Sequence, residues 1–135
     1  MSCPACGEPV VAFVVPPALR EHAPAAESAI CTSCLRTVAA SDAGAAAVAP
    51  EDADFSRIHE SFPTGKGAVA FALVLGKLDS LALNRPAIQA LCDAAERAGT
   101  DVPLALERLA GAPSLEPPYD IDRRRQQLAS FRNGA

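Results

Sequence analysis

The sequence contains few aromatic residues. Only 4% of its 135 residues are aromatic, and tryptophan is absent. Half of the residues are apolar, and most of these are Ala, Val and Leu. Because aromatic residues are scarce and Ala and Leu favour helices, we expect an aliphatic core built mainly from helices. A chain of this length has room for one ordinary domain, or for one domain with a small accessory module.

Basic residues are also in the minority. Lys and Arg together number 12, against 16 Asp and Glu, and the formal net charge is -4 at pH 7. A general nucleic-acid-binding protein is normally basic, so this balance argues against that class.

Long apolar runs are missing as well. The longest one, residues 68–75, lies between Lys66 and Lys77 and is far shorter than the ~18–20 residues of a membrane span. The N-terminus has no charged region followed by an apolar run, which a secretory signal would have. We therefore expect a cytoplasmic protein with no membrane association. In that reducing compartment, paired cysteines bind metal more often than they form disulfides.

Two CxxC pairs, CPAC and CTSC, are the most informative motifs. Two residues between the cysteines of a pair allow a tight turn to aim both sulfurs at one point. The run PVVAFVVP between the pairs is rich in β-branched residues and predicts a strand, so that a hairpin can bring the two turns together. The sequence therefore predicts a structural Zn²⁺ ion with four ligands: Cys3, Cys6, Cys31 and Cys34.

The local sequence favours the first turn over the second. Pro4 presets a turn dihedral and Gly7 permits positive φ, whereas Leu35 stands where glycine would ease the second turn. Four cysteines leave no open position for water, so the ion should stabilise the fold and not act as a Lewis acid. A redox dithiol is the alternative, but a redox CxxC usually begins a helix within a larger α/β fold, and that context is missing here.

Composition divides the chain into three parts. Residues 1–38 read as a zinc ribbon, residues 39–54 as a linker of small, polar or acidic residues, and residues 55–135 as a helical domain. The predicted fold class is thus a small N-terminal β zinc ribbon plus a C-terminal all-α bundle of about four helices. The helices are expected at about residues 63–83, 84–99, 101–111 and 120–131.

Several helix details follow from single residues. The first helix is apolar on most sides and should be the central, buried one. Gly76 within it marks a weak point or the close approach of a neighbouring helix. Asn84 and Asp101 stand where the second and third helices begin, and Gly99 is placed to end the second.

Other candidate residues have simpler explanations. Cys92 lies on the apolar face of the second helix and is expected to be a buried, inert thiol. His22 could replace a cysteine as a ligand, although four cysteines already suffice. His59 has no nucleophile in a recognised context beside it, so it predicts no catalytic role. The consecutive residues Arg123, Arg124 and Arg125 could contact phosphate or an acidic partner, but such a run is more often a solvated helix face.

Taken together, CPACG, CTSC, the preference for Arg over Lys and the block LDSLALNRPAIQAL resemble a known group. They are similar to the small CPxCG-related zinc-finger proteins of haloarchaea, and within these to an uncharacterised family of unknown function. The similarity runs over most of the chain, and the four cysteines match the family's presumed zinc ligands position by position. The resemblance implies zinc binding and supplies no reaction.

These observations favour a non-enzymatic protein. We expect a structural-zinc-binding protein–protein interaction or adaptor module whose ribbon presents a rigid loop surface to another protein. The alternative is a nucleic-acid-binding zinc-ribbon protein in transcription or translation, which would use the ribbon and Arg123–Arg125. An enzyme would need a deep pocket with convergent polar groups, and no small-molecule substrate is predicted.

Overall fold

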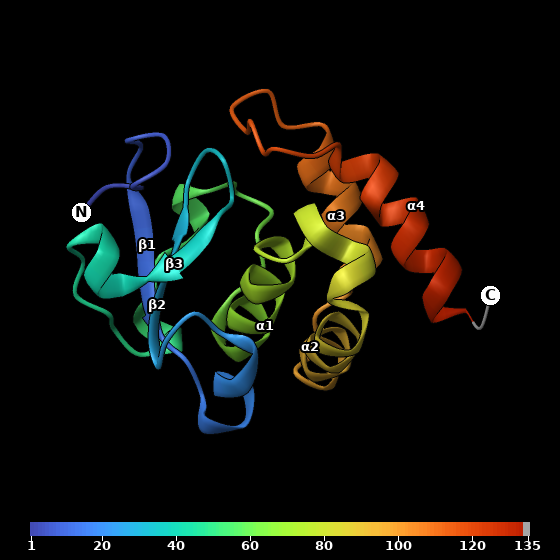
Figure 1. Cartoon of the computed structure of the whole chain (residues 1–135), viewed down its shortest axis with the longest axis horizontal. Coiled ribbons are helices and arrows are strands. Elements are labelled where there is room, and N and C mark those ends of the chain that lie inside the picture. Colours follow the sequence, from blue (N-terminus) through green and yellow to red (C-terminus); the bar gives the residue numbers. More distant parts are fainter. Residues whose placement is uncertain (134–135) are drawn as a thin grey trace.

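A three-stranded antiparallel sheet lies on one side of the central helix, and the other three α-helices lie on the opposite side (Figure 1). The computed structural model describes residues 1–133. The strands are β1 (Val10–Val14), β2 (Glu27–Cys31) and β3 (Thr37–Ala39), in the order β1-β2-β3. The α-helices are α1 (Gly65–Leu75), α2 (Arg85–Arg97), α3 (Val102–Ala110) and α4 (Ile121–Arg132). A small β part followed by about four helices is therefore confirmed.

The alternation of side chains along β1 and β2 gives the sheet two different faces. Val11 and Phe13 pack in the large core that the helices share, as does Ile30 on β2. Val10 packs instead in a smaller cluster that includes Cys31, the residue opposite it in the β1–β2 register. Since successive side chains of a strand point to opposite faces, one face of the sheet packs on the helices and the other contributes to the smaller cluster that contains the cysteines.

The α1 helix is the central, buried helix, as predicted. Every residue from 67 to 75 is buried. The helix is shorter than predicted, however, because it ends at Leu75, and a short 3-10 helix, η5 (Leu78–Leu83), follows it. A Cβ atom at Gly76 would collide with the side chain of Thr37. The close approach predicted at Gly76 is thus real, but strand β3 makes it and not a neighbouring helix.

The carbonyl groups left free where α1 ends are satisfied from distant parts of the chain. The hydroxyl of Tyr119 donates to the Leu75 carbonyl at 2.8 Å, and Arg124 Nε donates to the Leu78 carbonyl at 2.8 Å. A continuous helix would have used these carbonyl groups itself. Ser80, with φ -121° and ψ 51°, takes η5 further from helical geometry.

The ends of the other helices mostly follow local sequence. The side chain of Asp101 accepts a hydrogen bond from the Leu104 N–H at 3.0 Å, and Asp120 caps α4 through the Arg123 N–H at 3.0 Å. Gly99 ends α2 with a φ of +91°. Asn84 does not cap α2, because its side chain donates to the Ser80 carbonyl at 2.9 Å. Within residues 1–133, no helix combines the length and apolar character needed to cross a bilayer.

The segment 39–54 folds back onto the sheet. It contains two 3-10 helices, η2 (Ala40–Ala43) and η3 (Pro50–Asp52). The Val14 N–H donates to the Val48 carbonyl at 2.8 Å, and the Ser2 N–H donates to the Ala43 carbonyl at 3.1 Å. This segment, predicted as a linker, therefore hydrogen-bonds both the last residue of β1 and the N-terminal residues that precede the strand.

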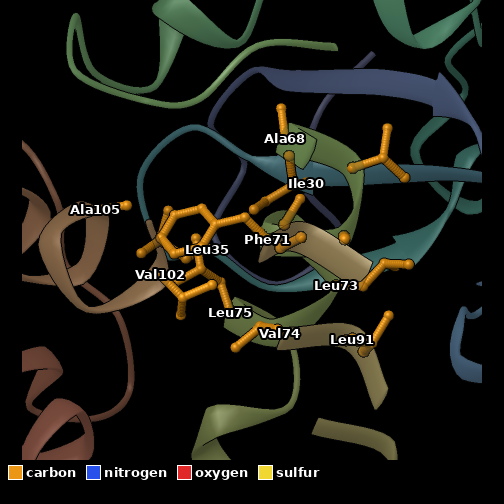
Figure 2. Close-up of a cluster of buried hydrophobic side chains, with 14 of the residues drawn as sticks. Ile30, Leu35, Ala68, Phe71, Leu73, Val74, Leu75, Leu91, Val102 and Ala105 are labelled. Atoms are coloured by element: carbon orange, nitrogen blue, oxygen red, sulfur yellow. The ribbon is translucent and has the colours of Figure 1, made fainter. Parts of the chain in front are cut away.

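One hydrophobic core joins the sheet to the helices. Figure 2 shows Ile30 and Leu35 from the N-terminal part beside Phe71 and Leu75 of α1 and Val102 of α3. The few aromatic residues are concentrated in this core. A continuous row runs through it, with ring centroids 5.6, 5.4 and 5.3 Å apart along the series Phe13, Phe55, Phe62 and Phe71.

Candidate metal centre

The first cysteine pair, Cys3 and Cys6, sits on a tight turn before β1. The Gly7 N–H donates to the Cys3 carbonyl at 2.8 Å, and Gly7 has a φ of +81°. The Ala5 N–H points at Cys3 Sγ from 3.4 Å. Positive φ is cheap for glycine, so the CPACG sequence closes this turn without strain.

The second cysteine pair, Cys31 and Cys34, sits on a similar turn after β2. The N–H groups of Ser33 and Cys34 both point at Cys31 Sγ, each from 3.4 Å. Leu35 follows with a φ of 62°, a left-handed conformation that costs a residue with a Cβ roughly 1–2 kcal/mol. The expectation that Leu35 makes this the more strained turn is confirmed. Its side chain is fully buried in the shared core, which offsets the cost.

The two turns bring the four sulfurs together. Cys3 Sγ lies 3.7 Å from Cys34 Sγ, and Cys6 Sγ lies 3.4 Å from Cys31 Sγ. The four Sγ atoms all lie within 4.8 Å of one another. Four thiolates bound at ~2.3 Å around one ion would lie about 3.8 Å apart, so the cluster has the dimensions of a tetrahedral metal site. The sulfurs are too far apart for disulfide bonds, which are ~2.05 Å long.

Burial and backbone N–H groups act on the thiols in opposite directions. Burial raises the pKa of Cys3, but the N–H groups of Cys6 and Ala5 outweigh it and lower that pKa to about 7. At Cys31 burial prevails and raises the pKa to about 12, and burial also raises the pKa of Cys34. The latter two residues therefore hold their protons until a cation replaces them.

A nearby cation complements the cluster. The pKa of Arg36 is raised because its guanidinium hydrogen-bonds the Cys34 side chain. Four thiolates around a divalent ion carry a net charge of about -2, and Arg36 lies where it reduces that charge. We did not single out Arg36 from the sequence, although a basic residue directly after CTSCL was the available signal.

The second turn is also held from the C-terminal half of the chain. The Glu116 N–H, in the proline-containing segment between α3 and α4, donates to the Ser33 carbonyl at 2.9 Å. Leu35, one residue beyond Cys34, lies beside Phe71 in the core (Figure 2). The sequence carries no local signal for the Glu116 contact. The cysteine cluster is thus attached to the helices on the side of the second pair.

Three other predicted residues lie outside the cluster. Cys92 is fully buried on α2, and burial raises the pKa of its thiol to about 11. His22 lies 3.7 Å from Glu21 and is not among the clustered side chains of residues 1–133. His59 Nδ1 accepts a hydrogen bond from the Ser61 N–H at 3.0 Å and so belongs to a local turn.

The three arginines of α4 have different surroundings. Arg124 donates to the Leu78 carbonyl and, at 2.8 Å, to Gln127 Oε1. Arg125 pairs with Asp122 at 2.6 Å. Arg123 is exposed, and within the part of the chain that the structure describes its guanidinium has no hydrogen-bond partner. The structure therefore does not bring the three together as one continuous basic surface.

Comparison with known proteins gives one match. A family model described as a family of unknown function, DUF6276, matches residues 2–132. No curated protein matches the chain, and no solved structure matches it either. The match covers both cysteine pairs, the sheet and all four α-helices, while a haloarchaeal origin stays a prediction. The chain belongs to the DUF6276 family, a family of unknown function.

Proposed function

We propose that this protein is a non-enzymatic, structural-zinc-binding protein that acts as a protein–protein interaction or adaptor module. The observation that carries the proposal is the convergence of four cysteine sulfurs within 4.8 Å from two turns far apart in the sequence. Zinc is the metal we favour, because an all-cysteine tetrahedral set is typical of structural zinc sites. Bound there, zinc supplies a crosslink between the N-terminal turn and the end of the β1–β2 hairpin.

The chemistry of the donor set supports a structural role over a catalytic one. Four thiolates fill a tetrahedral coordination sphere, which leaves no position for a substrate or an activated water. The two histidines, His22 and His59, are engaged locally and lie outside the cluster. A site of this kind needs reduced thiols, so we place the protein in the cytoplasm.

The shape of the first turn supports an interaction role. Residues 4–9 are all exposed, while Cys3 on one side and Val10 on the other are buried. A metal bound to Cys3 and Cys6 would hold this exposed loop in one conformation. Preorganised loops bind partners at a lower entropic cost than flexible ones.

The test measures bound zinc and its dependence on the cluster. We expect the purified protein to hold one zinc ion per chain by plasma mass spectrometry, and Cys3→Ser and Cys34→Ser to lose it. Cys92→Ala is the matched control, because it removes a buried cysteine outside the cluster and should keep the ion. Cobalt substitution should give the absorption bands of a tetrahedral thiolate site.

Two outcomes would contradict the proposal. A fully folded wild-type protein without metal would exclude structural zinc. Binding to RNA or DNA that weakens steeply with salt, and that is lost on replacing Arg123–Arg125 with alanine, would instead support the nucleic-acid alternative.

A further inference from the structure

A groove separates η5 and the start of α2 from helix α4. Its volume is about 550 Å³, within the range of ligand-binding pockets, ~300–1,000 Å³. Polar and apolar side chains both line it, and those used below are Asp79, Leu83, Arg85, Arg124, Gln127, Ser130 and Phe131. The groove is separate from the cysteine cluster, none of whose members lines it.

Two arginines in the groove are held in place without a carboxylate partner. The guanidinium carbon of Arg85 lies 5.8 Å from the centroid of the Phe131 ring. Arg124 is fixed by the Leu78 carbonyl and by Gln127, both at 2.8 Å. No ion pair with either arginine forms among residues 1–133. A guanidinium held by a ring or by neutral acceptors keeps its full positive charge, and little entropy remains to be lost on binding an anion.

A third arginine lies along the same edge. Arg123 precedes Gln127 by four residues and Ser130 by seven on α4, so the three share a helix face. Gln127 and Ser130 line the groove, and Arg123 is exposed beside them. Two arginines that line the groove and a third on the adjoining face of α4 therefore outnumber the one acidic lining residue, Asp79, in a chain whose net charge is -4.

An apolar surface adjoins these cations. Leu83 is 85% exposed, more than any other large hydrophobic residue of the described chain, and it lines the groove. Phe131 contributes a half-buried ring to the same wall. An exposed leucine next to these arginines can pack against an aliphatic side chain of a partner while the partner's carboxylates pair with the arginines.

We propose that this groove binds an acidic–hydrophobic peptide segment of a partner protein. Carboxylates of the segment pair with Arg85, Arg123 and Arg124, and an aliphatic side chain next to them packs on Leu83 and Phe131. The inference rests on the proposed adaptor function and assigns its partner surface. Nucleic acid fits this groove less well, because Arg85 already covers a face of the Phe131 ring on which a base would stack.

The test is a selection from a displayed library of random 12-residue peptides on the zinc-loaded full chain. We expect the enriched peptides to combine Asp or Glu with Leu, Ile or Phe. By fluorescence polarisation, Arg85→Glu and Arg123→Glu should each weaken their binding by about tenfold or more, since charge reversal turns an attraction into a repulsion. Arg108→Glu, an exposed residue of α3 with the same charge change, should bind as the wild type does.

Four results would contradict the proposal that this groove binds an acidic–hydrophobic peptide. These results are the absence of enrichment, enriched peptides without acidic residues, equal binding by Arg85→Glu and Arg108→Glu, and tighter binding of a 20-residue oligothymidine than of the peptides. Arg123→Glu changes an exposed residue whose side chain makes no hydrogen bond or ion pair within residues 1–133, so it tests the groove even if Arg85→Glu does not fold.

Two controls separate the groove from the proposed function. Peptides that lose binding in a Glu8→Arg variant of the exposed first turn, but not in Arg85→Glu, would keep an adaptor role and exclude the groove. Zinc content measured on the same preparations tests the metal independently of peptide binding.

Discussion

Leu35 combines an unfavourable backbone conformation with a favourable side-chain position. Its φ of 62° belongs to a region that glycine normally occupies, and yet its side chain is fully buried. Burying a leucine stabilises a fold by about 1.5–3 kcal/mol, which exceeds the roughly 1–2 kcal/mol of strain. The buried side chain therefore outweighs the backbone strain and connects the second cysteine turn to the core.

This balance predicts an inverted ranking of two substitutions. Leu35→Ala loses the buried side chain and keeps the strain, so we expect it to lower the free energy of unfolding by about 3 kcal/mol. Leu35→Gly loses the same side chain but relieves the strain, and should cost about 0.5–1 kcal/mol less than alanine, after allowance for glycine's larger unfolded-state entropy. Urea titration in excess zinc measures both values.

A matched pair at Leu91 provides the control. Leu91 is fully buried inside α2, where the helix fixes negative φ. There Leu91→Gly should be more destabilising than Leu91→Ala by about 1 kcal/mol, the normal order. If position 35 shows this normal order too, then Leu35 does not hold a left-handed conformation.

At the scale of elements, the end of α1 shows which structures could be foreseen. The helix start at Asp101 and the stop at Gly99 are confirmed, since each depends on residues within a few positions, whereas the cap predicted at Asn84 is wrong. The length of α1 was overestimated, because the donors that replace its helical hydrogen bonds, Tyr119 and Arg124, lie 44 and 46 residues from their acceptors. No local periodicity carries that information.

The different surroundings of two adjacent arginines on α4 yield a second prediction. Arg124→Ala removes donors to the Leu78 carbonyl and Gln127, and should lower the free energy of unfolding by about 1–3 kcal/mol, the cost of leaving a buried acceptor unpaired. Arg123→Ala removes an exposed side chain and should change it by at most about 0.5 kcal/mol. Thermal or urea unfolding of the two variants decides this, and equal effects would contradict the contact with η5.

At the scale of the whole molecule, the sheet and the helices depend on each other. The composition suggested an N-terminal part and a helical part, and the cysteine spacing correctly predicted four converging sulfurs. What spacing could not predict is that Phe13, Ile30 and Leu35 pack in the same core as α1. Pairings between distant faces depend on the fitting of surfaces, which a single sequence does not display.

This shared core predicts that removal of the metal affects the helices as well. We expect a chelator to convert the chain in one transition, with helical ellipticity at 222 nm and the near-ultraviolet signal of Tyr119 falling together. Tyr119 is the single tyrosine, and its hydroxyl is bonded to the end of α1, so its signal reports on the helices. Retention of full ellipticity in the metal-free chain would show instead that residues 1–38 unfold alone.

Cys6 differs from the other three clustered cysteines in being exposed. A chelator or metal-accepting protein that competes for a bound ion displaces one sulfur at a time, and Cys6 Sγ is the sulfur that solvent can approach. Metal exchange should thus begin at Cys6 in the CPACG turn, and the three buried cysteines should release the ion last. The lifetime of the bound ion is then governed by a loop that the rest of the molecule does not cover.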